Sequence, residues 1–218
     1  MIALEPLGDR AFLASFSHED AAGCWASSVR GRNIEGVTDV VLAYRSAAVY
    51  ADPDRIDLDR LGEILRSIEI DASAVEDEPG RLVTIPVLYD GPDLTDVTDR
   101  LGLTPDDVIE LHSGAEYRVF AIGFLPGFPY AGYLPQRLSG LPRRAEPRLR
   151  VPAGSVAITG RQTGIYPVES PGGWHLLGRT PLRIANPELG DFPIRSGDRI
   201  RFQPITRDEF EARRDERP

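Results

Sequence analysis

Glycine and proline punctuate the segment from Tyr117 to Thr180 so densely that no helix of ordinary length fits within it. Short runs rich in β-branched and aromatic residues, such as 117–124 and 155–159, alternate with these breaks. This pattern is typical of short β-strands joined by tight turns. Because proline fixes φ and removes a backbone donor, the eight prolines of the segment stiffen its loops. Stiff loops on a sheet are a common place for binding and catalytic residues.

The residues before this segment predict a small N-terminal domain over residues 1–80. A β-hairpin is expected at 2–16, with its turn at Gly8 and Asp9, followed by an amphipathic helix at 17–33. Strands at 37–43 and 47–51 and a helix at 57–70 repeat that order. Two strand pairs, each followed by a helix, favour an α+β fold of ferredoxin-like type. The acidic stretch 71–80 is the predicted linker.

Residues 81–218 predict a mostly β domain with two helices near its start. Strands are expected at 81–89, 182–184 and 199–204, in addition to those of the central segment, and a charged tail at 206–218. A short helix is expected at 94–101, and a second begins at Thr104 with Pro105 at its first position. His112, near the end of this second helix, is predicted to favour the helix dipole as a protonated imidazole rather than to act in catalysis. The whole pattern suits a closed or nearly closed barrel.

Charge and composition exclude several functions. All 25 basic residues counted as lysine and arginine are arginine, so a Walker A lysine and a Schiff-base lysine are both excluded. A net charge of −9 argues against general nucleic-acid binding. Residues 117–205 nevertheless carry 12 arginines and 5 acidic residues, which fits either an anion-attracting site or arginines scattered over a solvated surface.

The chain also lacks the residues for metal, disulfide and membrane roles. One cysteine excludes an internal disulfide, and three histidines give no spacing for a structural zinc site, so no metal site is expected. No apolar run has membrane-spanning length, and no signal-peptide pattern is present at the N-terminus. We therefore expect a cytoplasmic protein with no membrane partner.

Two motifs stand out within the central segment. The first, at 123–130, reads GFLPGFPY, and the second, at 152–174, reads PAGSVAITGRQTGIYPVESPGGW. Their glycines allow close backbone approach and their aromatic residues supply flat apolar walls, although plain structural turns have the same composition. A nucleophilic Ser155 or Ser170 would need a base, and no nucleophile-elbow pattern is present, so a serine hydrolase is not expected.

These two motifs, together with the closing SGDRIRF at 196–202, closely resemble the KipI/PxpB family, also called allophanate hydrolase subunit 1. The resemblance extends over nearly the whole chain and implies a small α+β domain followed by a cyclophilin-like β-barrel. It also implies a subunit of a 5-oxoprolinase, which acts with KipA/PxpC-type and PxpA-type partners to open 5-oxoproline to glutamate using ATP and Mg²⁺. Two alternatives stay open: a KipI-type inhibitor of a sensor histidine kinase, and a carboxyltransferase subunit of the allophanate hydrolase or urea carboxylase type.

The resemblance and the local chemistry together give the candidate site residues. Neutral hydrogen-bonding groups that could orient an amide are the catalytic candidates, and arginines, aromatic rings and loop glycines are the substrate-binding candidates. The catalytic candidates are Gln162, Thr163 and Tyr166; the substrate-binding candidates are Phe124, Pro126, Gly127, Phe128, Arg148, Arg161, Gly164, Ser170, Gly172, Gly173, Trp174 and Arg179.

Overall fold

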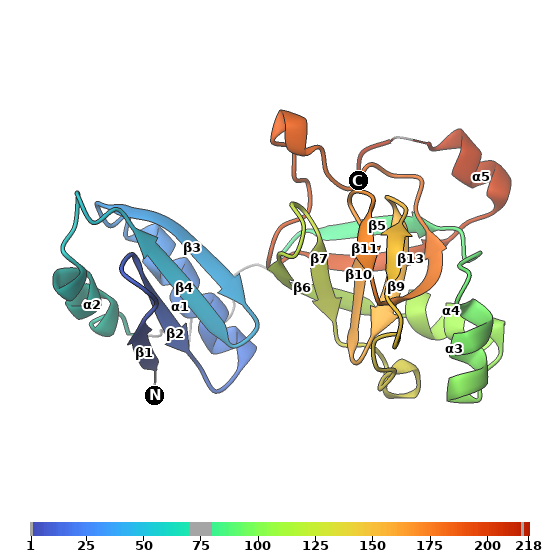
Figure 1. The fold of residues 1–218 in the computed structure, drawn as a ribbon, viewed down its shortest axis with the longest axis horizontal. Coiled ribbons are helices and arrows are strands. Elements are labelled where there is room, and N and C mark those ends of the chain that lie inside the picture. Colours follow the sequence, from blue (N-terminus) through green and yellow to red (C-terminus); the bar gives the residue numbers. More distant parts are fainter. Residues whose placement is uncertain (1, 70–79, 215) are drawn as a thin grey trace. The chain divides into compact units, whose positions relative to one another are not determined.

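The computed structural model of the protein describes residues 2–69, 80–214 and 216–218. The chain divides into two units, Met1–Pro79 and Gly80–Pro218, each with its own hydrophobic core (Figure 1). Of the predicted linker at 71–80, only Gly80 lies within the described residues. No helix among the described residues is long and apolar enough to cross a membrane.

The N-terminal unit is a four-stranded antiparallel sheet with two helices. Alternate side chains of one strand, Phe12, Ala14 and Phe16, are buried, and Trp25 of the first helix packs on Phe16 with ring centroids 5.5 Å apart. One face of the sheet therefore meets the helices and supplies the core. The elements are β1 (Ala3–Pro6), β2 (Ala11–Ser15), α1 (Glu19–Gly31), β3 (Val37–Ala43), β4 (Ser46–Ala51) and α2 (Leu58–Arg66), with sheet order β1-β2-β4-β3.

The predicted strand pairs and helices of this unit are confirmed, but the ferredoxin-like arrangement is not. A ferredoxin-like unit runs β-α-β-β-α-β, whereas this chain runs β-β-α-β-β-α. Each strand pair closes through a tight turn with positive φ, at Gly8 (69°) and Tyr44 (53°), before its helix begins. Each helix consequently follows a finished hairpin: α1 connects the first hairpin to the second, and α2 comes after the second.

The C-terminal unit is built on a seven-stranded sheet that curls into a nearly closed barrel. Its strand order is β12-β9-β10-β7-β6-β13-β5, with β13 and β5 parallel and the other neighbouring pairs antiparallel. The strands are β5 (Leu82–Val87), β6 (Glu116–Ile122), β7 (Pro129–Gly132), β9 (Ser155–Thr159), β10 (Gln162–Ile165), β12 (His175–Arg179) and β13 (Arg199–Pro204).

The two edges of this sheet meet just beyond β5. Leu88 and Arg179 exchange both backbone hydrogen bonds, at 2.9 and 3.0 Å. Gly178 permits this contact, because a Cβ there would lie 2.3 Å from the carbonyl oxygen of Leu88. The bridge between Leu88 and Arg179 therefore joins the two edges at one point and nearly closes the barrel.

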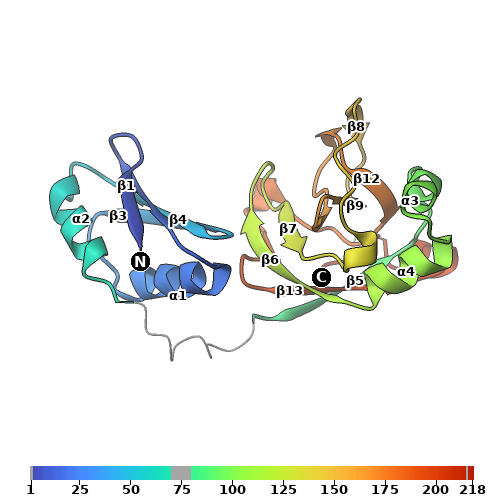
Figure 2. The same ribbon diagram turned by 90° about the horizontal axis from the view of Figure 1, so that it is seen from below.

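Two helices and a two-stranded arm are attached to the barrel. Helices α3 (Leu94–Leu101) and α4 (Pro105–Ser113) lie side by side at one end of the barrel in Figures 1 and 2. The arm pairs β8 (Arg148–Val151) with β11 (Ser170–Gly172), and β8 projects from the barrel in Figure 2. The remaining elements are two 3₁₀ turns, η2 (Gln136–Leu138) and η3 (Pro187–Leu189), and helix α5 (Arg207–Ala212).

The predicted strands and helices of this unit are present, to within a few residues, except at residues 182–184. Between residues 117 and 180 the only helical element is the short turn η2, as the glycine and proline pattern predicted. Leu182 and Ile184 are buried, but their backbone forms no strand. Their backbone donors are used elsewhere: the N–H of Leu182 donates to the Thr180 hydroxyl at 3.3 Å and the N–H of Arg183 to the Glu216 carbonyl at 2.8 Å.

Candidate functional site

The two motifs of the central segment meet in a small pocket, called the aromatic pocket below. Phe128 lies at its centre and contacts the rings of Phe124, Tyr130, Tyr166 and Trp174, with centroids 5.0 to 5.6 Å apart. The cavity has a volume of about 270 Å³, which suits a small molecule. Its lining consists of Phe124, Phe128, Tyr130, Arg143, Arg144, Pro147, Tyr166, Pro171, Gly172, Gly173 and Trp174.

Local backbone features place these rings. Phe124 has a φ of +66°, a region that bulky residues rarely adopt, and its side chain is 61% exposed. Phe128 is only 1% exposed and lies over Gly164 of β10, where a Cβ would come within 2.9 Å of the ring. The glycine of β10 therefore makes room for the ring that forms the base of the pocket.

Two arginines and two phenol groups give the aromatic pocket its polarity. Arg143 is exposed and Arg144 is half-buried, and the backbone N–H of Arg144 donates to the carbonyl of Gly173 at 2.8 Å. Burial raises the pKa of the Tyr130 and Tyr166 hydroxyls above their ordinary value, and Tyr166 also hydrogen-bonds to the Trp174 backbone. Both hydroxyls are consequently protonated at neutral pH and can act as hydrogen-bond donors.

Some of the predicted site residues line the aromatic pocket, and the others lie outside it. Gly164 lies beneath its base, and Ser170 is buried on the neighbouring strand β11. Arg161 lies outside it, with its guanidinium 4.0 Å from the centroid of the Tyr133 ring. The predicted residues that line it are Phe124, Phe128, Tyr166, Gly172, Gly173 and Trp174.

A second cavity of about 800 Å³, the basic groove, holds two of the predicted anion-binding arginines. Arg179 donates two hydrogen bonds to Asp90, at 2.8 and 3.2 Å, and stacks on Phe210. Arg148 donates to Asp93 at 2.6 Å. Each of these arginines therefore already has a carboxylate partner, which weakens the case for them as anion contacts. The arginines lining the groove are Arg148, Arg150, Arg179, Arg183 and Arg214.

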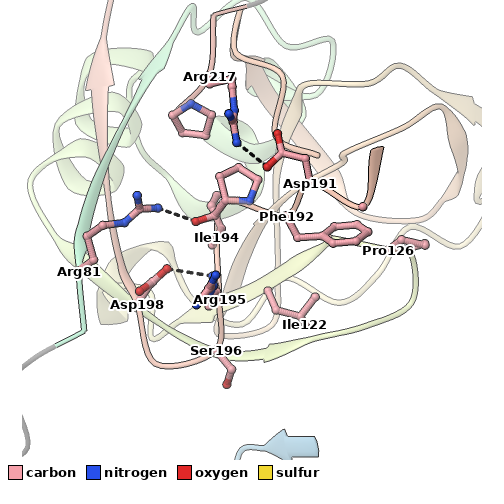
Figure 3. A pocket seen from close by; sticks show the side chains of 14 residues that line it. Arg81, Ile122, Pro126, Asp191, Phe192, Ile194, Arg195, Ser196, Asp198 and Arg217 are labelled. Carbon is pink, nitrogen blue, oxygen red and sulfur yellow. Dashed lines mark hydrogen bonds and ion pairs between the residues drawn. The ribbon is translucent and has the colours of Figure 1, made fainter. Parts of the chain in front are cut away.

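A third cavity, of about 930 Å³, includes the predicted residues Pro126 and Gly127 (Figure 3). Its polar side chains bond within the protein: Arg217 to Asp191 at 2.5 Å, and Asp198 to the backbone N–H of Arg195 at 2.9 Å. Figure 3 shows these pairs across the cavity wall. The aromatic pocket holds six of the predicted site residues and this cavity only two, so we place the candidate site in the aromatic pocket.

Thr163, predicted as catalytic, is instead part of a buried polar network. Its hydroxyl contacts His112 Nε2 at 2.9 Å and the carbonyl oxygen of Ala157 at 3.2 Å, and its side chain is fully buried. Gln162 precedes it on β10, where successive side chains point to opposite faces. The geometry therefore supports a structural role for Thr163, whose side chain points to the opposite face of β10 from that of Gln162. Of the three catalytic candidates, Tyr166 is the one that lines the aromatic pocket.

His112 has a role that the sequence did not reveal. Its Nδ1 lies 2.7 Å from the Tyr89 hydroxyl, and its ring stacks on Phe202 at 4.3 Å. Because Thr163 donates to Ala157, it accepts from Nε2–H of His112, and Nδ1 then accepts from Tyr89. Burial lowers the pKa of His112 to about 3. The predicted interaction of a protonated imidazole with the helix dipole is therefore wrong, because this imidazole is neutral.

Because the His112 imidazole is buried and neutral, we expect the protein to lose stability in mild acid. The unfolded chain protonates His112 below pH 6.5, whereas the folded chain does so only near pH 3. The contribution of neutral His112 to the free energy of unfolding is therefore fully present above pH 6.5. Between pH 6.5 and 3 it falls by up to about 1.4 kcal/mol for each unit by which the pH is lowered. We expect urea unfolding to show that the stability advantage of the wild type over His112→Gln shrinks from pH 7.5 to 4.5. Parallel pH profiles for the two proteins would contradict this assignment.

Asp93 is the other polar residue that sequence reasoning missed. It precedes α3 as its N-cap residue but makes no side-chain capping bond. Its carboxylate instead accepts from Arg144 at 2.7 Å, from Arg148 at 2.6 Å and from the backbone N–H of Leu176 at 2.7 Å. This buried group, called the Asp93 cluster below, joins the aromatic pocket to the basic groove, because Arg144 lines the first and Arg148 the second.

The chain is similar to proteins of a known family over most of its length. A family model described as the carboxyltransferase domain, subdomain C and D, matches residues 2–193. A 5-oxoprolinase subunit of Escherichia coli O157:H7 is 46% identical over 176 residues, covering 78% of this chain and 76% of that protein. The protein of the same name in Bacillus subtilis (strain 168) is 34% identical over 241 residues, covering 98% of this chain and 97% of that protein. The chain belongs to this carboxyltransferase-domain family and, within it, to the KipI/PxpB group that the motifs indicated.

Solved structures agree with the fold. The crystal structure of TTHA0988 matches with a TM-score of 0.79 and 39% identity, over 90% of this chain and 40% of that one. This chain thus spans two fifths of TTHA0988. The Kluyveromyces lactis urea amidolyase matches with a TM-score of 0.70 and 20% identity, over 97% of this chain and 15% of that one. That likeness shows the fold alone.

Proposed function

We propose that this chain is one subunit of an ATP-dependent 5-oxoprolinase, acting with a KipA/PxpC-type subunit and a PxpA-type subunit. The observation that carries the proposal is its 46% and 34% identity to two proteins named as the same 5-oxoprolinase subunit, one of them matched along almost its whole length. Residues of both family motifs also line one pocket in this chain. A subunit of this kind would contribute part of the site and depend on its partners for turnover.

The chemistry of the aromatic pocket suits 5-oxoproline. This substrate is a five-membered lactam that carries one carboxylate, so it needs apolar walls for the ring, a cation for the carboxylate and donors for the amide oxygen. Phe128 and Trp174 offer the walls, and the Arg143 and Arg144 side chains offer the cations. The protonated hydroxyls of Tyr130 and Tyr166 are suitable donors to a lactam oxygen that gains negative charge as the ring opens.

ATP and Mg²⁺ fit this chain less well than the lactam does. Phosphorylation by ATP would turn the lactam oxygen into a better leaving group, and Mg²⁺ in nucleotide sites is held by one or two carboxylates besides the phosphates. The described residues contain no group of three or more histidine, cysteine, aspartate or glutamate side chains that could hold a metal. Asp90 of the basic groove is already bonded to Arg179 and Arg207. We therefore assign ATP and Mg²⁺ to the assembled complex and derive no step on this chain from them.

The proposal is tested by reconstitution. This chain, purified with its KipA/PxpC-type and PxpA-type partners, is expected to convert 5-oxoproline to glutamate in the presence of ATP and Mg²⁺. Omission of this chain is expected to abolish glutamate formation. If a complex assembled with the corresponding Bacillus subtilis protein is active and the one assembled with this chain is not, the proposal fails.

Within that complex, Tyr166→Phe is expected to lower kcat about 100-fold, because one donor to the developing oxyanion is lost. KM for 5-oxoproline should change little, since the aromatic ring remains. Steady-state kinetics would measure both constants. The matched control is Tyr50→Phe, which removes a hydroxyl from a half-exposed tyrosine of the N-terminal unit. Equal kcat values for Tyr166→Phe and Tyr50→Phe would contradict a role for the Tyr166 hydroxyl.

A further inference from the structure

The charges of the Asp93 cluster do not balance. Arg144 and Arg148 share a single carboxylate oxygen of Asp93, which leaves one positive charge in excess. Asp93 is 2% exposed, and the side chains of Arg144 and Arg148 are each more than half buried. Asp96 of α3 also attracts Arg144 electrostatically, but its side chain is 40% exposed and bonded to Arg100, so it offsets the excess charge only in part. Because an excess charge in a partly buried cluster is costly, this cluster favours the binding of an anion.

Arg144 is the member of the cluster that faces the aromatic pocket. Its Nη1 is bonded to Asp93, while its Nε is buried and has no hydrogen-bond partner among the described residues. Its backbone N–H is fixed to the Gly173 carbonyl, so the arginine is held from both ends beside the pocket. A guanidinium with unused donors and a fixed position is well suited to bind a carboxylate.

We propose that Arg144 is the carboxylate-binding and specificity-determining residue of the aromatic pocket. Its ligand would be a small cyclic amide with one carboxylate, placed with its ring against Phe128 and Trp174 and its carboxylate on the Arg144 guanidinium. This inference rests on the proposed function for the identity of the ligand. It replaces Arg148, Arg161 and Arg179 as the expected anion contacts, because Arg144 lines the aromatic pocket and none of those three does.

The test compares 5-oxoproline with 2-pyrrolidinone, which has the same lactam ring but no carboxylate. Binding is measured by NMR on the full chain and again on the chain assembled with the KipA/PxpC-type subunit. The chain has two tryptophans, and Trp174 lines the pocket while Trp25 is buried in the N-terminal unit, so the indole signals report where the ligand binds. We expect the Trp174 signal to shift and 5-oxoproline to bind about 10- to 100-fold more tightly than 2-pyrrolidinone.

Three variants test the assignment of that preference to Arg144. Arg144→Gln is expected to abolish the preference and leave 2-pyrrolidinone binding unchanged, and Arg144→Lys, which keeps the charge but loses the planar fork, is expected to retain part of it. The matched control is Arg137→Gln, an exposed arginine outside all three cavities, which should keep the full preference.

The possible outcomes separate this inference from the proposed function. If Arg144→Gln still prefers 5-oxoproline over 2-pyrrolidinone as strongly as the wild type does, the inference is overturned. It is also overturned if the wild type shows no preference between the two ligands, either alone or assembled with the KipA/PxpC-type subunit. A shift of Trp25 without Trp174 overturns it as well. These last two readouts need no variant, so they decide the question even if Arg144→Gln does not fold. If the preference is found but the complete complex does not hydrolyse 5-oxoproline, the proposed function fails while the carboxylate site stands.

Discussion

Replacing Asp93 by alanine is expected to lower the free energy of unfolding by about 3–5 kcal/mol, because the change leaves buried charges without their partner. Arg144 and Arg148 would both lose their carboxylate, and the backbone N–H of Leu176 would lose its acceptor. The Nε of Arg144 and Nη1 of Arg148 already lack partners among the described residues, so the cluster has little capacity to compensate. Urea denaturation at neutral pH would measure the loss.

Asp96→Ala is the matched control for this prediction. Asp96 lies three residues further along the chain, on α3; it approaches His175 Nδ1 at 3.6 Å and attracts Arg144, but its side chain is 40% exposed and its direct hydrogen bond is an i,i+4 pair with Arg100. Surface pairs of this kind contribute about 0.5 kcal/mol or less. A similar cost for Asp93→Ala and Asp96→Ala would show that the Asp93 cluster is not a buried charge network.

Truncating Phe128 to alanine is expected to lower the free energy of unfolding by about 3–5 kcal/mol and to abolish ligand binding in the aromatic pocket. The ring is 1% exposed and contacts four other aromatic rings, so its removal leaves a cavity that Gly164 beneath it cannot fill. Denaturation gives the change in stability, and NMR titration with 5-oxoproline gives the change in affinity.

Phe124→Ala separates the two effects of the Phe128 change. Phe124 belongs to the same motif and contacts Phe128 edge to face, but its ring is 61% exposed. Its truncation should therefore cost about 1 kcal/mol or less in stability, since little area is uncovered, while it still weakens binding. A Phe128→Ala protein that keeps wild-type affinity for 5-oxoproline would exclude the aromatic pocket as the site.

Much of the secondary structure could be read from short-range signals. Helix α4 begins at Thr104 with a capping box to Asp107 and ends before Gly114, as the sequence predicted, because these interactions span three or four residues. Helix α3 was also predicted with its observed bounds; it has no side-chain cap at its start but ends at Gly102, whose φ of 64° is left-handed. Residues 182–184 are the exception: their apolar pattern predicted burial correctly but not strand pairing, because their backbone donors bond to partners outside the sheet.

The candidate site was predicted only in part. The aromatic and glycine residues of the two motifs were identified, and six of them line one pocket. Gln162 and Thr163 were grouped with Tyr166 because they are close in sequence, yet Thr163 faces the core and contacts His112. Arg148 and Arg179 were chosen as cations in a basic segment, and their carboxylate partners lie 55 and 89 residues away.

The sequence by itself determined most of the strands, turns and helices to within a few residues, since those choices depend on backbone freedom and capping over short distances. It also determined the family, through two long motifs. Only the tertiary structure decided which side chains share a pocket and which charges neutralise one another. The closed barrel brings Asp93 beside Arg144 and His112 beside Thr163, each 51 residues apart, and such contacts follow from strand register and sheet closure, which no local pattern encodes.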